Sequence, residues 1–160
     1  MAEILPFPAD HGPRFTVLVV DDEPAIRGML CEFLEEYGHN PIAVENADQA
    51  MPLICGGAEI DLVFSDVRMP GTMDGCALAR WILENRPDLP VILTTGDLGQ
   101  ADATDLSGVE IFPKPYAFDA AVRKIRDAIV NGKVKSLGLN QPLLRQWINR
   151  SDGALPASQT

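Results

Sequence analysis

The stretch "VLVVDDEPAIR" at residues 17–27 joins an apolar run directly to three consecutive acids. The run has the length and the β-branched content of a buried strand, and Pro24 is a common first residue of a helix. This stretch therefore predicts a strand, a short acidic loop and a helix in direct succession. The adjacent carboxylates of Asp21 and Asp22 repel each other. The rest of the chain must therefore explain why two acids stand side by side here.

Apolar runs of strand length recur along the chain, at 16–20, 40–44, 61–65, 90–95 and 109–112. Helical patterns separate them at 24–37, about 47–55, 74–85 and 117–130. Three of the runs are nearly continuous in apolar residues, which is typical of strands buried on both faces. Five strands alternating with helices predict an α/β fold: a doubly wound, flavodoxin-like parallel sheet in the order 2-1-3-4-5 with helices on both faces. The polar segment 96–108 predicts a short, shifted or partly melted helix.

Length and composition fit one domain of 160 residues, 46% of them hydrophobic. We expect an N-terminal extension at 1–14, the folded domain at 15–131 and a tail at 132–160. The first 14 residues lack the basic start and the apolar segment of a secretory signal peptide. No apolar run approaches the roughly 18 residues of a membrane span. These features predict a cytoplasmic protein without a membrane span.

Cysteines and charge narrow the class of function further. The three cysteines form no CxxC pair, so we interpret them as reduced, small apolar residues and expect no zinc site. The net charge of −10 argues against direct binding of nucleic acid, which needs clustered Lys and Arg. Residues 1–122 hold 21 acids and 6 bases, whereas 123–150 are basic, a contrast that indicates solvated faces or a docking surface.

Polar side chains stand where the expected strands end. Asp21 and Asp22 follow the first strand, Asp66 the third and Thr95 ends the fourth, while Lys114 stands just past the fifth. The carboxyl ends of parallel strands share one edge, and neighbouring first and third strands bring the three aspartates together. A cluster of carboxylates needs a cation, and an oxygen-only cluster suits Mg²⁺. The alternative is that "VVDDE" places acids near the positive end of a helix and does nothing more.

These residue types support phosphoryl chemistry. A carboxylate beside Mg²⁺, a lysine and a hydroxyl can attack a phosphoryl group, while the metal and the ammonium neutralise its oxygens. Asp66 would then become an aspartyl phosphate.

The motifs "VVDDE", "FSDVRMPGTMDG", "PVILTTG" and "PKPY" stand in the order and spacing of a known family. Over residues 15–131 the chain resembles the receiver domain of two-component response regulators, single-domain and similar to chemotaxis regulators. The resemblance implies a Mg²⁺-dependent phosphoacceptor with the following residues: Asp66 as nucleophile, Asp21 and Asp22 as metal ligands, the backbone carbonyl of Arg68 on the metal, Thr95 at the phosphoryl oxygen, and Lys114 on the phosphate before a cis bond to Pro115.

Two departures from the family pattern stand close to the expected site. "MPGTMDG" has one residue more than usual between Pro70 and Asp74, which should alter the loop beside Asp66 without moving the nucleophile. The family usually has an aromatic residue where this chain has Ile111, and that aromatic acts as a switch together with the threonine equivalent to Thr95. Phe112 is adjacent, but it should lie on the opposite face of the strand.

The resemblance implies a bacterial signalling protein rather than a conventional enzyme. It would take phosphate from a sensor histidine kinase or a histidine phosphotransfer protein, dephosphorylate itself, and signal by binding an output protein that the sequence does not identify. About 30 residues follow the domain, too few for a DNA-binding output domain. Alternatives are a phosphorelay shuttle, a phosphate sink or the receiver portion of a hybrid kinase.

Other classes fit less well. A haloacid dehalogenase-type phosphatase needs a second aspartate where Arg68 stands. A flavodoxin-like FMN site would have acids facing its phosphate. A histidine phosphotransfer protein needs a histidine on a helical bundle, which neither His11 nor His39 provides. A pseudo-receiver that is never phosphorylated is disfavoured because the five polar residues at the strand ends are all present: Asp21, Asp22, Asp66, Thr95 and Lys114.

The tail carries a helical stripe within 140–150, formed by Leu143, Leu144, Trp147 and Ile148. A helix this short is marginal alone in water, so it should dock on its own receiver body or on a second subunit. A homodimer is therefore one of the expected assemblies.

Overall fold

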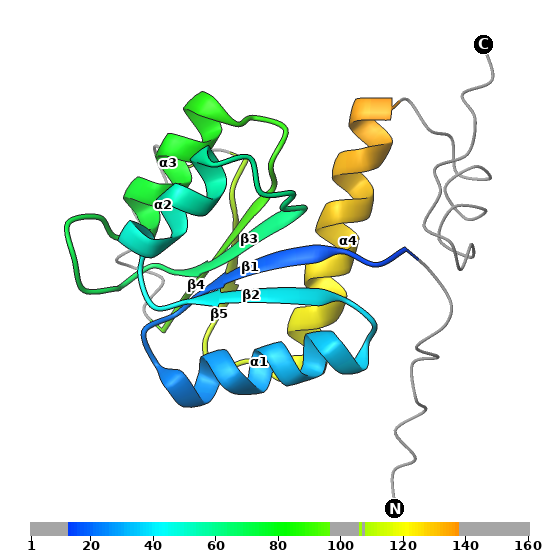
Figure 1. The fold of residues 1–160 in the computed structure, drawn as a ribbon. Coiled ribbons are helices and arrows are strands. Elements are labelled where there is room, and N and C mark those ends of the chain that lie inside the picture. Colours follow the sequence, from blue (N-terminus) through cyan, green and yellow to red (C-terminus); the bar gives the residue numbers. More distant parts are fainter. Residues whose placement is uncertain (1–12, 97–105, 107, 138–160) are drawn as a thin grey trace, which may run out of the picture.

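The structure, a computed structural model, describes residues 13–96, 106 and 108–137 (Figure 1). Within these residues the strands are β1 (Thr16–Val20), β2 (Asn40–Val44), β3 (Leu62–Asp66), β4 (Val91–Thr95) and β5 (Glu110–Pro113). The helices are α1 (Pro24–Glu36), α2 (Ala47–Cys55), α3 (Gly75–Asn85) and α4 (Phe118–Leu137). All the strand pairs are parallel, and the sheet order β2-β1-β3-β4-β5 confirms the predicted fold class.

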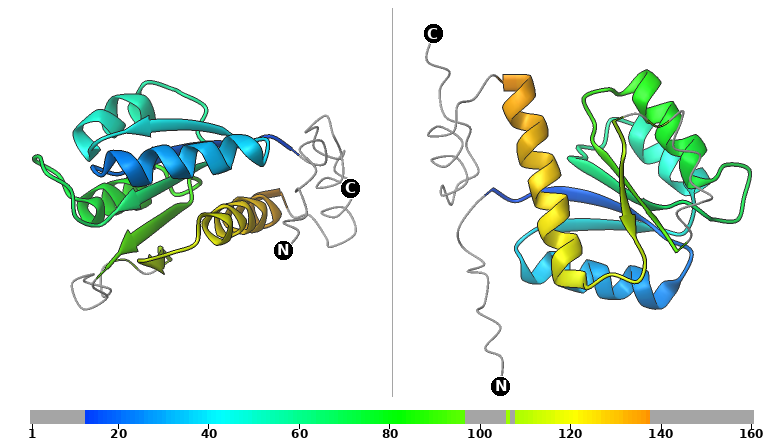
Figure 2. Two further views of the ribbon diagram at one scale, coloured as in Figure 1. Left: turned by 90° about the horizontal axis from the view of Figure 1, so that it is seen from below. Right: turned by 180° about the vertical axis from the view of Figure 1, so that it is seen from behind.

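Helices cover both faces of the sheet: α1 and α4 pack on one face and α2 and α3 on the other (Figures 1 and 2). Alternate residues of β1 supply the two cores, with Val17 and Val19 facing α1 and α4, and Leu18 facing α2 and α3. All three side chains are at most 1% exposed. Burial on both faces explains why the central strands are almost continuously apolar in sequence.

The first helices begin and end where the sequence predicts. Pro24 occupies the first turn of α1, and Gly38, with a φ of 85°, follows its end in a conformation that favours glycine. The side chain of Asn46 caps α2 by accepting a hydrogen bond from the Gln49 backbone N–H at 2.9 Å. These local signals place α1 and α2 within one residue of the prediction.

The later elements differ from the prediction in their bounds. β3, β4 and β5 each begin one residue later than expected, so Asp66 is the last residue of β3 and not the first residue after it. α4 continues to Leu137, seven residues beyond the predicted end, and within this extra stretch Lys133 forms an ion pair with Asp61 at 3.8 Å. The helix expected at 96–108 falls largely outside the described residues, as do most of the extension expected at 1–14 and the whole tail helix expected at 140–150.

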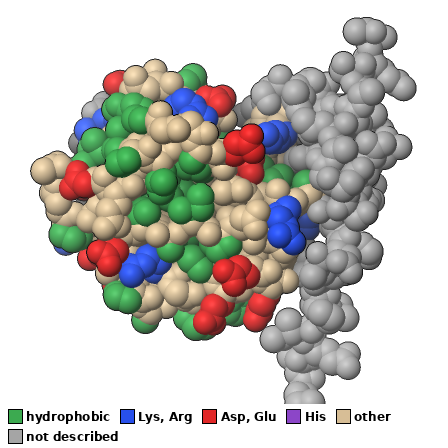
Figure 3. Space-filling view, viewed as in Figure 1, with side chains coloured by type: hydrophobic (Ala, Val, Ile, Leu, Met, Phe, Trp, Pro, Cys, Tyr) green, Lys and Arg blue, Asp and Glu red, His purple; other side chains and the backbone are tan. Residues whose placement is uncertain are grey.

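Charged side chains on the face seen in Figure 3 are scattered among apolar and other groups, with acids and bases interspersed. Among the described residues, none of the helices is both long and apolar enough to cross a membrane. Cys31, Cys55 and Cys76 are all free thiols, as predicted.

Candidate phosphorylation site

Three aspartates converge at the carboxyl ends of β1 and β3. These strands are neighbours, with Val20 opposite Ser65, so Asp21 and Asp66 lie side by side. Asp21, Asp22 and Asp66 each offer a carboxylate oxygen, and these oxygens lie within 4.8 Å of one another. Asp21 and Asp66 are buried, whereas Asp22 is exposed. The predicted convergence is therefore present.

Backbone and side-chain contacts fix the orientation of Asp21. Its backbone N–H donates to the carbonyl oxygen of Val44 at 3.2 Å, and its Oδ1 accepts from the Glu23 N–H at 2.9 Å. Arg27 Nη1 donates to the Asp21 carbonyl oxygen at 2.7 Å. Burial raises the pKa of the Asp21 carboxyl; the hydrogen bond from Glu23 and the charge of Lys114 oppose this shift.

Lys114 is the cation of the cluster. Its Nζ lies 2.9 Å from Asp66 Oδ2, 3.5 Å from Asp21 Oδ2 and 3.9 Å from Glu23 Oε1. Burial by itself lowers the pKa of Lys114, but the hydrogen bond to Asp66 and the surrounding carboxylates outweigh it, and the pKa is raised. The lysine is therefore held as a charged ammonium against the acid cluster. The sequence did not indicate the part that Glu23 has in this contact.

A cleft of about 470 Å³ opens over this cluster. Its lining consists of Asp22, Glu23, Asp66, Arg68, Thr95, Gly96 and Lys114. Thr95 is buried at the end of β4, and its carbonyl oxygen accepts from the Lys114 backbone N–H at 2.9 Å. Arg68 is exposed, and its backbone N–H donates to Asp66 Oδ1 at 3.3 Å. The cleft is lined by all the predicted site residues except two, Asp21 and Ile111. Asp21 adjoins the cleft through its contact with Lys114.

Gly75 lets the start of α3 approach the end of β3 closely, a role that the sequence did not reveal. A Cβ atom added at Gly75 would lie 2.0 Å from the backbone oxygen of Asp66. The Gly75 N–H donates to the carbonyl oxygen of Val67 at 2.9 Å, which fixes this close approach. The start of α3 can therefore contact the end of β3 only because residue 75 lacks a side chain.

The loop after Asp66, in which the sequence shows an extra residue, is attached to α2. Asp48 accepts hydrogen bonds from the Thr72 backbone N–H at 3.2 Å and from the Thr72 hydroxyl at 2.5 Å. These two hydrogen bonds lower the pKa of Asp48. Asp48 lies outside the four family motifs, so only the fold reveals this attachment.

Ile111 lies away from the acid cluster. It is half-buried on β5 and pairs with Leu93 of β4. Phe112 packs on the opposite face with the ring of Tyr116, at a centroid distance of 5.5 Å. The prediction that Phe112 faces away from the switch position is confirmed.

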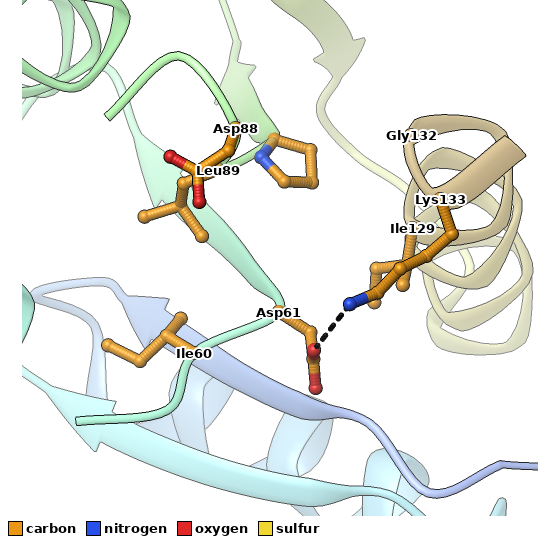
Figure 4. A pocket seen from close by; sticks show the side chains of 8 residues that line it. Ile60, Asp61, Asp88, Leu89, Ile129, Gly132 and Lys133 are labelled. Atoms are coloured by element: carbon orange, nitrogen blue, oxygen red, sulfur yellow. Dashed lines mark ion pairs between the residues drawn. The ribbon is translucent and has the colours of Figure 1, made fainter. Parts of the chain in front are cut away.

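A second cavity, of about 150 Å³, lies at the opposite end of the sheet (Figure 4). Lys133 reaches from α4 toward Asp61 across it, with 3.8 Å between Nζ and Oδ1. Asp61 Oδ2 also accepts from the Thr16 backbone N–H at 2.8 Å. Asp61 thus connects β1, the start of β3 and α4 at this end of the sheet.

The protein has a five-stranded parallel sheet with a cleft at the carboxyl ends of its strands, and this cleft holds an acid cluster and a lysine. These features together are those of a receiver domain. The family model for the response regulator receiver domain matches residues 17–126, and the chain belongs to this family.

The relatives are bacterial regulators. The DNA-binding transcriptional regulator NtrC of Salmonella typhimurium is 37% identical over 119 residues, which cover 72% of this chain and 25% of that protein. The chain thus spans about a quarter of the length of such curated relatives. The solution structure of the apo receiver domain of nitrogen regulatory protein C is 36% identical, with a TM-score of 0.66, over 74% of this chain and 96% of that one. The response regulator TrrA of Thermotoga maritima, solved with Mg²⁺ and BeF, is 32% identical, with a TM-score of 0.65, over 71% and 98% of the two chains.

Proposed function

We propose that the protein is a phosphoacceptor that takes a phosphoryl group on Asp66 in two-component signalling. The observation that carries this proposal is the contact of 2.9 Å between Lys114 Nζ and Asp66 Oδ2 at the base of an open cleft. An ammonium in this position can neutralise an oxygen of an incoming phosphoryl group. Membership of the receiver family supports the same assignment.

The residues at the site fit Mg²⁺. Asp21, Asp22 and Asp66 offer only oxygen ligands within 4.8 Å of one another, and two of the carboxylates are buried, so their charges need compensation. These three residues and the backbone carbonyl of Arg68 would hold the ion. When bound, Mg²⁺ supplies positive charge to the phosphoryl oxygens.

In the proposed step, a carboxylate oxygen of Asp66 attacks the phosphorus of a phosphohistidine. The new P–O bond forms as the P–N bond breaks, and the imidazole of the donor leaves with the bond's electron pair and takes up a proton. Lys114 stays with the transferred phosphoryl group, and the Thr95 hydroxyl is proposed to contact one of its oxygens. Later attack by water breaks the P–O bond and returns the carboxylate and inorganic phosphate.

The receiver family implies a kinase or phosphotransfer partner. We propose that a sensor histidine kinase or a histidine phosphotransfer protein supplies the phosphate in the cytoplasm. The output is then a phosphorylation-dependent contact with another protein; a relay shuttle, a phosphate sink and the receiver portion of a hybrid kinase are the alternatives. They differ in where the phosphate goes next, which a phosphotransfer assay to candidate histidine proteins measures.

Phosphorylation by acetyl phosphate tests the proposal directly. With Mg²⁺, intact-mass spectra should show one added phosphoryl group, which chelation of Mg²⁺ and Asp66→Asn should each abolish. Asp88→Asn is the matched control, because Asp88 is an exposed aspartate that lines the cavity at the other end of the sheet. Equal phosphorylation of Asp66→Asn and the wild type would refute the assignment of Asp66.

A further inference from the structure

Two buried hydroxyl groups close to the site have no hydrogen-bond partner within the part of the chain that the structure describes: Thr94 Oγ1 and the phenol oxygen of Tyr116. Thr94 is 1% exposed. Native proteins pair the large majority of buried polar side-chain atoms, with other protein groups or with ordered water. Each of these two hydroxyl groups therefore calls for a polar partner.

The strand register brings these two hydroxyls to the same side of the sheet. Thr94 lies between its register partners Asp66 on β3 and Phe112 on β5. It follows Ile92 by two residues and so projects toward the same face, the one covered by α1 and α4.

The ring of Tyr116 covers this part of β4. It contacts Phe64 of β3 edge-on at a centroid distance of 5.8 Å and Phe112 of β5 at 5.5 Å. Because β4 lies between β3 and β5, a ring that contacts both aromatic residues extends across β4 on the face from which Thr94 projects. The Tyr116 ring therefore lies over the strand that carries Thr94, on the face toward which Thr94 projects.

We infer that Thr94 and Tyr116 together bind one buried water molecule beneath the phosphorylation site. Water suits this position because it can both donate to and accept from two hydroxyl groups that do not reach each other directly. Burial, followed by the charges of Asp21, Asp66 and Glu23, raises the pKa of Tyr116, so its phenol keeps its proton as a donor.

Such a water molecule would link two segments of the site. Tyr116 belongs to the loop that begins at Lys114, and Thr94 precedes Thr95, whose carbonyl oxygen accepts from the Lys114 N–H. The bridge would hold this loop against β4 and slow the hydrogen exchange of the Lys114 amide. The inference concerns hydration of the folded domain and does not depend on phosphorylation.

A double-mutant cycle with Thr94→Val and Tyr116→Phe, measured by urea unfolding, tests the inference. If the hydroxyls share a water molecule, each single substitution leaves it with one partner fewer and should raise the unfolding equilibrium constant about twofold to tenfold. The increase in the unfolding equilibrium constant of the double variant should then be at least about threefold smaller than the product of the two single increases. If the hydroxyls have no partner, each substitution should leave the constant unchanged or lower it, and the effects should multiply.

Controls keep the result interpretable. Tyr37→Phe combined with Thr94→Val should show independent effects, because Tyr37 lies at the end of α1. In a Thr94→Ser background, which keeps the hydroxyl, Tyr116→Phe should have the same effect as in the wild type. A crystal structure of the wild type should show one water molecule within hydrogen-bond distance of both oxygens, which decides the question even where a variant fails to fold. An empty space there, or multiplicative effects in the cycle, would overturn the inference.

Discussion

Lys114 Nζ and Asp66 Oδ2 lie 2.9 Å apart although 48 residues separate them in sequence. Parallel pairing of β3, β4 and β5 creates this contact, since each residue stands at the carboxyl end of its strand. The lysine is 15% exposed in its side chain and Asp66 is 10% exposed, so water screens the pair only partly. The pair therefore serves stability as well as the proposed chemistry.

Replacing Lys114 by Met should lower the free energy of unfolding by about 1–3 kcal/mol in the absence of divalent cations. The substitution keeps the length of the side chain but leaves Asp21 and Asp66 without their nearest positive charge. Urea unfolding monitored by circular dichroism measures the loss. Addition of Mg²⁺ should recover part of it, because a cation that binds only the folded acid cluster stabilises the fold.

The control for this variant is Lys124→Met, which removes an ammonium paired with Glu110 at the surface. Both partners there are more than a third exposed, so the loss should stay below about 1 kcal/mol and should not respond to Mg²⁺. Equal losses for the two variants would contradict the special position of Lys114.

Gly75→Ala should be strongly destabilising, by about 1–3 kcal/mol or more, because the new methyl group would collide with the backbone of Asp66. Gly28→Ala is the opposite case: nothing lies within 4 Å of the added Cβ in the exposed middle of α1. Alanine favours the helix there, so this variant should gain about 0.5–1 kcal/mol. Urea unfolding of both variants checks the contrast, and a neutral Gly75→Ala would show that the close approach can relax.

The sequence predicted β1 and α1 because their signals are local. Pro24, Gly38 and the buried strand of residues 16–20 indicate these elements without knowledge of any partner. Strand limits are different, since they depend on which neighbour continues the pairing: Asp66 belongs to β3 because it pairs with Thr94. The full length of α4 was missed for a similar reason: beyond residue 130 it contacts a partner distant in sequence, through the ion pair of Lys133 with Asp61, which the local pattern does not reveal.

The acid cluster could be predicted because a parallel sheet collects strand ends at one edge, which brings Asp21, Asp66 and Lys114 together by topology alone. The attachment of Thr72 to Asp48 could not be predicted in this way. It joins a loop to a helix 24 residues earlier, and neither residue type indicates a partner. The close approach of Gly75 likewise exists only once α3 lies against β3.

Asp48→Ala should weaken Mg²⁺ binding about threefold to tenfold while leaving the fold intact. The variant releases Thr72 and with it the loop that carries Arg68, whose backbone carbonyl is a proposed metal ligand; loss of supporting hydrogen bonds commonly weakens metal sites by such factors or more. Calorimetric titration with Mg²⁺ measures the effect. Asp48→Asn keeps one acceptor and should be intermediate, and wild-type affinity in both variants would exclude a role for this attachment.

His39 should make stability depend on pH in the mildly acidic range. It is 8% exposed, its ring stacks on Phe15, and its Nδ1 accepts a hydrogen bond from the Phe15 backbone N–H at 3.3 Å. Burial, with the charges of Arg126 and Arg14, lowers its pKa to about 4. The folded protein therefore holds His39 uncharged at neutral pH.

The direction of this pH dependence follows from the lowered pKa of His39. Below about pH 6.5 the unfolded chain binds a proton at residue 39 that the folded chain does not bind until about pH 4, so the unfolded state is favoured progressively as pH falls between these values. The stabilisation is complete above this window, and about 2 kcal/mol of it should be lost between about pH 7 and pH 5. His39→Asn retains an acceptor for the Phe15 N–H but cannot titrate, so urea unfolding of this variant should lose less stability than the wild type over the same interval. Parallel pH profiles for the two proteins would contradict the assignment of this dependence to His39.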